Sequence, residues 1–210
     1  MEVTGSILNR KWLLCLILWM VHAWHYGSCD LAEFTDGLDF YSYNVIDISG
    51  NDMSLEKYRG KVSLVVNVAS QCGYTQGHYQ GLILLQEYFG STEKFNVLAF
   101  PCDQFGHQEP GTDSEIMNFA NHKMGANFPL FAKVNVKKED VSPVWNYLTR
   151  NSGQTPTWNF WKYLVDHNGH VLSAWGPSTN PDQLYPAVRV AISNAEKEES
   201  SRRDESRKEL

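Results

Sequence analysis

The sequence predicts a single α/β domain in which helices flank a mixed central sheet. Two apolar runs, 61–69 and 95–100, have the composition of buried strands, and residues 75–89 between them place apolar side chains at helical spacing. A strand–helix–strand unit predicts parallel pairing through a right-handed crossover. Residues 163–166 and 170–175 flank a His-Asn-Gly turn, which predicts an antiparallel hairpin. The predicted sheet therefore contains both kinds of pairing.

Two further elements are predicted, one before the first buried strand and one after the second. Residues 40–48 alternate apolar and polar side chains and stop at a Gly-Asn pair, 50–51, so a short β-hairpin is expected there. Residues 114–124 have helical spacing, and a capping box can form near Thr112 or Asp113.

The second half of the chain adds elements that complete the domain, which we place at residues 36–193. Residues 131–136 are a strand candidate, and residues 143–149 start with a proline, which favours the first turn of a helix. Residues 181–192 have a helical pattern and close the domain. About 170 residues remain once both ends of the chain are set aside, enough for one domain with a real core.

Residues 1–29 have the pattern of a secretory signal peptide. A basic pair at 10–11 precedes the apolar stretch 12–21, and small residues follow. The apolar stretch is shorter than the about 20 residues that a membrane-spanning helix needs. We expect cleavage after Ala23 or near Cys29, and an uncleaved anchor is the alternative.

The C-terminal residues 196–210 are rich in charges of both signs and poor in apolar side chains. This composition predicts that the closing helix fades into a flexible, solvated tail. The chain ends in Arg207-Lys208-Glu209-Leu210, which resembles the Lys-Asp-Glu-Leu retention signal but differs at its first two positions. Combined with an N-terminal signal, this ending predicts the lumen of the endoplasmic reticulum and a retention receptor as a partner. Secretion and a membrane-anchored lumenal location are the alternatives.

Charge and cysteine content exclude several classes of protein. The net charge is −6, the isoelectric point is about 5.6, and no basic patch occurs, so nucleic acid is not expected as a partner. The seven histidines lack the spacing of metal ligands, and no metal or other cofactor is expected. Of four cysteines, Cys15 and Cys29 lie in or beside the predicted signal, which leaves too few for a disulfide scaffold.

Cys72 is the clearest candidate for chemistry. It lies where the first buried strand gives way to a helix, and a helix N-terminus favours negative charge. Such a place stabilises the thiolate, which is the nucleophilic form of cysteine. A mixed sheet with a reactive cysteine after its first core strand resembles the thioredoxin-like fold. Thr75 stands where thioredoxins have their second cysteine, so exchange through a local disulfide is not expected.

Three sequence blocks resemble one family in order, spacing and residues. They are residues 67–75 (NVASQCGYT), 98–111 (LAFPCDQFGHQEPG) and 157–165 (TWNFWKYLV). The resemblance is to the glutathione peroxidase family and covers residues 36–193. Together with the two ends of the chain, it is strongest to the monomeric, cysteine-containing members of the endoplasmic reticulum. A thioredoxin-like fold and a thiol-dependent peroxidase activity on hydrogen peroxide or organic hydroperoxides are what this resemblance implies.

The resemblance implies a catalytic tetrad of Cys72, Gln108, Trp158 and Asn159. The thiolate would attack one peroxide oxygen and become a sulfenic acid. Amide and indole N–H groups can donate hydrogen bonds to the thiolate and to the negative charge that develops. Two of these assignments have alternatives, because Gln104 competes for the amide role and Trp158 could be a core aromatic.

The return of the oxidised cysteine to the thiol is less clear from the sequence. Cys102 is either a small buried apolar side chain or a second, resolving redox thiol. Residues 119–129, where many cysteine-type relatives carry a resolving cysteine, contain none, and the short segment 151–156 favours a monomer with weak glutathione specificity. Glutathione or a protein disulfide isomerase is therefore expected as the reducing partner. A peroxide sensor that reacts once, or a redox adaptor without turnover, remains an alternative.

Overall fold

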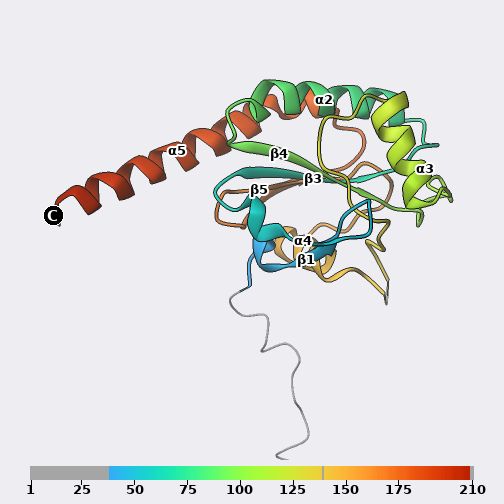
Figure 1. Ribbon diagram of the computed structural model, residues 1–210, viewed down its shortest axis with the longest axis horizontal. Coiled ribbons are helices and arrows are strands. Elements are labelled where there is room, and N and C mark those ends of the chain that lie inside the picture. Colours follow the sequence, from blue (N-terminus) through green and yellow to red (C-terminus); the bar gives the residue numbers. More distant parts are fainter. Residues whose placement is uncertain (1–37, 139, 209–210) are drawn as a thin grey trace, which may run out of the picture. The chain divides into compact units, whose positions relative to one another are not determined.

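A four-stranded mixed sheet forms the centre of the domain (Figure 1). The computed structural model describes residues 38–138 and 140–208. The strand order is β4-β3-β5-β6, in which β3 pairs with β4 in parallel and the other two pairs are antiparallel. The strands are β3 (Val62–Val68), β4 (Phe95–Pro101), β5 (Lys162–Val165) and β6 (Val171–Trp175). This sheet confirms the predicted α/β class with both kinds of pairing.

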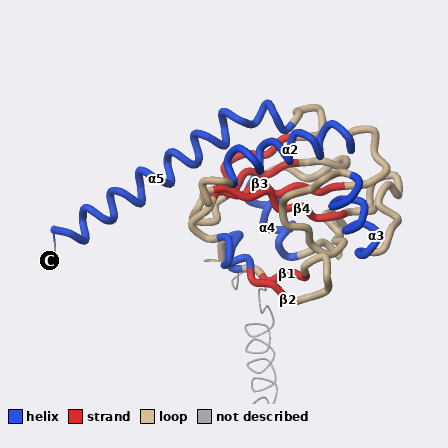
Figure 2. The backbone as a smooth tube through the Cα atoms, turned by 45° about the horizontal axis from the view of Figure 1, so that its top comes forward, coloured by secondary structure: helices blue, strands red, loops and turns tan. Residues whose placement is uncertain are grey.

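The helices cover both faces of this sheet, as Figures 1 and 2 show. Successive side chains of β3 point to opposite faces of the sheet, and a core cluster covers each face. Every residue of β3 is therefore buried. One cluster packs under α2 and α5, and the other packs against α4 and the N-terminal hairpin. The main helices are α2 (Thr75–Gly90), α3 (Asp113–Asn118), α4 (Pro143–Ser152) and α5 (Tyr185–Lys208).

Short elements complete the domain. The predicted N-terminal hairpin is confirmed as β1 (Asn44–Ile46) paired with β2 (Asp52–Ser54). The capping box is confirmed at Thr112, whose hydroxyl accepts the N–H of Glu115 while the Glu115 carboxylate accepts the N–H of Thr112. The remaining turns are η2 (Phe40–Ser42), η3 (Leu55–Tyr58), the π-helical η4 (Phe119–Lys123) and η5 (Pro181–Leu184).

The prediction of a strand at residues 131–136 is wrong. This segment makes only isolated bridges, because its N–H groups donate to different partners: Phe131 to Ala99 and Ala132 to Ile46. The N–H of Val136 donates to the side chain of Gln104 at 2.8 Å. A chain that divides its hydrogen bonds in this way cannot build a ladder, although Phe131 and Val136 are buried.

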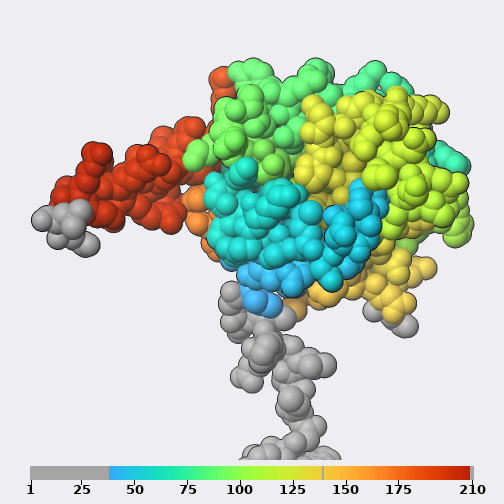
Figure 3. Space-filling view, in the orientation of Figure 1, coloured from blue at the N-terminus to red at the C-terminus, as the bar shows by residue number. Residues whose placement is uncertain are grey.

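The closing helix is longer than its apolar pattern predicts. Helix α5 continues to Lys208, through most of the segment expected to be a flexible tail. Residues from Glu196 onward are almost all exposed, and Figure 3 shows them in red, standing out from the rest of the domain. Glu198 and Arg202 are paired at 2.8 Å, and Glu199 pairs with Arg203, both at the i, i+4 spacing that supports an exposed helix.

Both ends of the chain carry predictions that the described residues do not reach. The signal peptide predicted at 1–29 lies outside them, as do the last two residues of the predicted retention signal. Within residues 38–138 and 140–208, no helix has the length and apolar character to cross a membrane.

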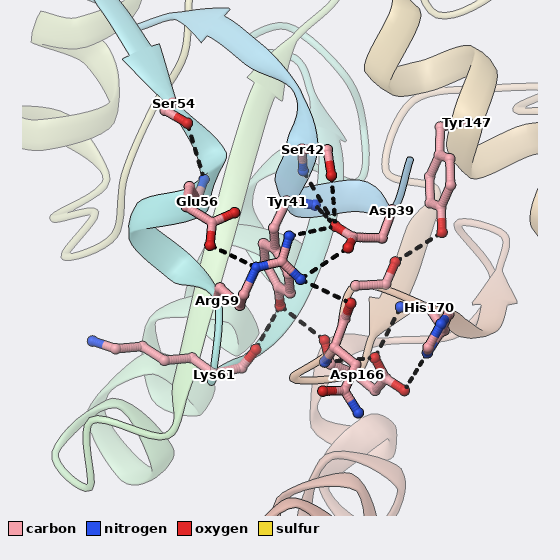
Figure 4. Close-up of polar contacts among 12 residues, drawn as sticks. Asp39, Tyr41, Ser42, Ser54, Glu56, Arg59, Lys61, Tyr147, Asp166 and His170 are labelled. Atoms are coloured by element: carbon pink, nitrogen blue, oxygen red, sulfur yellow. Dashed lines mark hydrogen bonds and ion pairs between the residues drawn. The ribbon is translucent and has the colours of Figure 1, made fainter. Parts of the chain in front are cut away.

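A polar network closes the end of the sheet where β3 begins (Figure 4). The Arg59 guanidinium donates to both carboxylate oxygens of Asp39 at 2.9 and 3.0 Å and to the carbonyl of Asn168 at 3.2 Å. The buried Tyr41 hydroxyl donates to the carbonyl of Asp166 at 3.0 Å. These contacts join the N-terminal turn to the β5–β6 hairpin. The predicted site lies at the opposite end of β3, its carboxyl end.

Candidate active site

Cys72 lies in the turn between β3 and α2, as predicted. Its side chain is only 8% exposed, and its N–H donates to the Thr75 hydroxyl at 3.1 Å. The same hydroxyl donates to the carbonyl of Ala69 at 2.7 Å. Thr75, which occupies the place of a second cysteine, therefore folds the turn instead of taking part in redox chemistry.

Gln108 is brought to this turn through the backbone. The N–H of Gln71 donates to the carbonyl of Gln108 at 3.0 Å, so the two loops are joined one residue away from Cys72. Gly106 and His107 adopt positive φ values of 66° and 50°, which turns the chain sharply just before Gln108. The carboxyl end of the parallel pair β3 and β4 thus holds both loops.

Asn159 binds the Gln108 side chain directly. The Asn159 amide is fully buried, and its NH₂ group donates to the Gln108 side-chain oxygen at 2.9 Å and to the carbonyl of Phe105 at 3.4 Å. Because the Gln108 oxygen is occupied in this way, its own NH₂ group is the part that is left to donate to a thiolate or a substrate.

Trp158 lies beside the same loop. A Cβ placed on Gly106 would lie 3.5 Å from the Trp158 ring and 3.6 Å from the side-chain amide carbon of Gln108, so both side chains flank this glycine. The Trp158 ring is 38% exposed, which does not fit a core aromatic. Trp161, by contrast, packs against the core cluster under α4. The structure therefore assembles Gln108, Trp158 and Asn159 into one group, joined by backbone to the Cys72 turn.

Asn67 holds the Trp158–Asn159 segment in place, a function that sequence reasoning missed. This fully buried residue of β3 donates its side-chain NH₂ to the carbonyl of Trp158 at 3.2 Å. Its side-chain oxygen accepts the N–H of Trp161 at 2.8 Å. The signal was present in the sequence, because an asparagine stands in a mostly apolar strand.

Replacing Asn67 by alanine is expected to lower the free energy of unfolding by about 2 kcal/mol, because two backbone groups lose their hydrogen bonds to this buried side chain. Urea denaturation measures this change. The matched control is Asn96→Ala on β4, since the side-chain NH₂ of Asn96 has no partner within the described residues. Equal losses in the two variants would contradict the proposed clamp.

Gln104 and Gln108, the two candidates for the amide role, make different contacts. The Gln104 side-chain oxygen accepts the N–H groups of Val136 and Lys137 at 2.8 and 3.1 Å, and its NH₂ donates to the carbonyl of Lys137 at 3.0 Å. All of its near contacts anchor the loop after β4. Gln108 alone of the two touches Asn159.

Cys102 is not brought to Cys72 as a partner. Both cysteines are free thiols, but Cys102 is fully buried and belongs to the core cluster on the other face of the sheet. Burial raises the pKa of the Cys102 thiol, with smaller opposing contributions from nearby backbone N–H groups. This environment disfavours the thiolate that thiol exchange requires. Its packing is that of a buried apolar side chain.

Glu109 is a second residue that sequence reasoning missed. Its carboxyl group is fully buried next to Gln108 and makes no well-formed hydrogen bond within the described residues. Burial raises its pKa to about 7. Donors of Ser70 and the Lys133 ammonium offset part of this shift, and Asp103 adds to it.

The raised pKa makes the stability of the fold depend on pH. A carboxyl group with a higher pKa in the folded state binds its proton more tightly there, so stability falls as the pH rises from about 4.5 through about 7. Between pH 4 and pH 8, the unfolding free energy of Glu109→Gln relative to the unchanged protein should therefore rise by about 3 kcal/mol. Urea denaturation at several pH values measures this difference. Parallel pH curves for the two proteins would contradict it.

These features define a class of protein: a thioredoxin-like domain with one thiol at the strand–helix turn, next to a loop that presents amide and indole donors instead of a second cysteine. Such a site can stabilise a thiolate. It can also stabilise the negative charge that develops on the leaving oxygen when a peroxide O–O bond breaks. Among the described residues, no three His, Cys, Asp or Glu side chains gather as metal ligands.

Comparisons with known proteins agree with this class. The family model described as Glutathione peroxidase matches residues 40–149. Glutathione peroxidase 7 of Mus musculus is 51% identical over 177 residues, which covers 84% of this chain and 89% of the relative. The chain therefore belongs to the glutathione peroxidase family and is an oxidoreductase of the peroxidase type.

Solved structures give the same result for the fold. The crystal structure of Trgpx in apo form aligns with a TM-score of 0.63 and 29% identity, covering 75% of this chain and 97% of that one. A thioredoxin family thiol:disulfide interchange protein from Chlorobium tepidum aligns with a TM-score of 0.55 over 73% of this chain and 95% of its own, at 15% identity. The second likeness shows the fold alone, and it confirms the thioredoxin-like prediction.

Proposed function

We propose that this protein reduces hydrogen peroxide or organic and lipid hydroperoxides through Cys72. The thiolate sulfur attacks one peroxide oxygen, the O–O bond breaks, and water or an alcohol leaves after taking up a proton. Cys72 is thereby oxidised to a sulfenic acid. Two thiol equivalents then reduce it. The first forms a mixed disulfide with Cys72 and releases water, and the second attacks the sulfur of the first, so that Cys72 leaves as a thiolate and the two reductant sulfurs form a disulfide.

The observation that supports this proposal most directly is the joining of three loops at Cys72. A backbone hydrogen bond fixes the Gln108 loop to the Cys72 turn, and Asn159 orients the Gln108 amide. Trp158 is partly exposed and lies beside Gly106 of the Gln108 loop. Donors that are fixed before the reaction stabilise developing charge without the cost of reorganisation.

The reductant in this proposal is a thiol supplied from outside the domain. Cys102 is buried in the other core cluster, which supports glutathione or a protein disulfide isomerase type of oxidoreductase over an internal partner. With an oxidoreductase as reductant, peroxide would drive disulfide formation in other proteins. We further propose that the protein is a monomer, which the short segment 151–156 supports. Its proposed location is the lumen of the endoplasmic reticulum, supported by the predicted signal peptide and the Arg207-Lys208-Glu209-Leu210 ending.

A coupled assay tests this function. Peroxide-dependent consumption of NADPH is measured with glutathione and its reductase, and separately with a disulfide isomerase and a reductase that regenerates its thiols. Repeated turnover with either reductant is the expected result. The Cys102→Ser variant is the control and should keep the same rate, because Cys102 takes no part in the proposed cycle.

The burial of Cys102 also favours a second candidate, a peroxide sensor. An oxidised Cys72 without an internal resolving thiol can persist as a signal. In the coupled assay, consumption of a single equivalent of peroxide would support the sensor and contradict the peroxidase. No consumption at all would support an adaptor that binds oxidoreductases without turnover.

A further inference from the structure

Lys162 is a buried cation that the proposed peroxide chemistry does not use. It starts β5, opposite Val66 of β3, and its side chain is fully buried. Its ammonium donates to the carbonyls of Phe160 at 2.7 Å and Gly176 at 3.1 Å, and it lies 3.5 Å from Nδ1 of His78. None of the ion pairs among the described residues includes Lys162, whereas lysines are almost never fully buried without a paired carboxylate.

His78 is the third partner of this amine and is itself buried. It belongs to the first turn of α2 and is 1% exposed. Its Nε2 lies 3.0 Å from the carbonyl of Pro177, which can only accept, so Nε2 carries a proton and Nδ1 is free to accept from Lys162. The ring packs against Phe160 and Tyr74, with centroids 4.9 and 5.5 Å apart.

The contacts of these two bases determine how many protons they hold. Three carbonyls, those of Phe160, Gly176 and Pro177, each need one hydrogen, and the Lys162–His78 contact needs a fourth. A charged lysine with a neutral histidine supplies four. Two neutral bases supply three and leave one contact without a hydrogen, whereas two charged bases supply five and oppose each other. The arrangement therefore fits a single positive charge shared by the pair.

The environment places that charge on Lys162 and makes it removable near neutral pH. Burial lowers the pKa of Lys162 to about 7. Burial, and then the charge of Lys162, lower the pKa of His78 to about 4, while the Pro177 carbonyl and Asp182 of η5 act in the opposite direction. Asp182 is the charged group that acts on the pair from the η5 side. The pair is thus charged below about pH 7 and neutral above it.

The pair connects the segments that frame the site. Phe160 directly follows Asn159, and the N–H of His78 donates to the carbonyl of Tyr74 within the turn that follows Cys72. Cys72 and Phe160 lie in the same core cluster under α2. Loss of one hydrogen from the four contacts would loosen the Trp158–Phe160 segment from the start of α2.

We propose that Lys162 and His78 are positioning residues which share one proton and, while they hold it, lock the Trp158–Phe160 segment against the first turn of α2 beside Cys72. The reactivity of Cys72 is then enhanced while the pair is charged, and this enhancement is lost as the pH rises and the proton leaves. The consequence for peroxide reduction rests on the proposed function, whereas the shared proton does not.

The shared proton is tested by nitrogen NMR of the full chain labelled at the lysine amines and histidine rings. One lysine should titrate near neutral pH, this titration should be missing in Lys162→Met, and His78 should keep its proton on Nε2 at pH 6. A spectrum in which every lysine titrates above about pH 9, near the ordinary value, would overturn the proposal.

The effect on Cys72 is tested by its rate of alkylation with iodoacetamide, followed by mass spectrometry of the Cys72 peptide. At pH 6, Lys162→Met should slow this reaction about tenfold, because small displacements around a reactive group have effects of this order or larger. At pH 9 the two rates should agree within about twofold, since both proteins then lack the charge. If the ratio of the two alkylation rates, unchanged protein to Lys162→Met, does not change with pH, the positioning role is overturned.

Two further variants separate positioning from a loss of folding. His78→Asn keeps an acceptor near the Lys162 amine and should retain more of the pH 6 rate than His78→Leu. The exposed Lys57→Met is the matched control and should behave as the unchanged protein. Since alkylation needs no peroxide, a protein that failed to turn over peroxide but showed this pH-dependent ratio would contradict the proposed function and support the pair.

Discussion

Replacement of Cys72 by serine is expected to abolish peroxide-dependent turnover, with a loss of about 10³-fold or more. A hydroxyl group is far less acidic than a thiol and is not oxidised to the equivalent of a sulfenic acid, so the first step has no substitute. Nearly all of Cys72 is covered, and serine fits the same space, so the fold should be retained. The coupled NADPH assay measures the loss.

Two controls make this result specific. Cys102→Ser changes the other free thiol of the described domain and should leave turnover intact. Circular dichroism and urea denaturation should show the same fold for both variants. Full turnover by Cys72→Ser would contradict the assignment of Cys72 as the nucleophile and, with it, the proposed reaction.

The second large effect is expected from Asn159→Asp, which should lower the rate of Cys72 oxidation by peroxide about 100-fold. The change keeps the size of the side chain but removes the NH₂ group that donates to Gln108 at 2.9 Å. It also sets a carboxylate oxygen against the Gln108 oxygen. The Gln108 amide would then turn its NH₂ toward residue 159 and away from the reacting atoms.

Stopped-flow measurement of sulfenic acid formation tests this expectation, since it reports the first step without the reductant. Asn121→Asp makes the same charge change at an exposed position and is the matched control. A variant at position 159 with an unchanged oxidation rate would show that the orientation of Gln108 does not matter for the reaction.

The sequence predicted the elements whose pattern is local. The apolar runs of β3 and β4, the helix between them and the capping box at Thr112 all follow from residues within a few positions of one another. The segment 131–136 failed because its apolar residues report burial alone, whereas a strand also needs one neighbouring strand to receive its hydrogen bonds. The extension of α5 was missed because it depends on ion pairs, not on an apolar face.

The candidate site divides in a similar way. Motifs in the sequence identified Cys72, Gln108, Trp158 and Asn159, and the structure assembles the last three of them beside the turn that holds the first. Nothing in the chain order distinguished Gln104 from Gln108, since both are glutamines in one loop. Their roles differ only through contacts with segments more than 30 residues away.

The sequence by itself determined the family, the candidate nucleophile and the absence of a second cysteine at Thr75, because these depend on which residues are present and how they are spaced. The tertiary structure alone decided that Asn67 clamps the Trp158 segment, that Cys102 lies in the other core cluster, and that Lys162 meets His78. The physical reason is that burial and hydrogen-bond partners arise from long-range packing, which local sequence patterns do not encode.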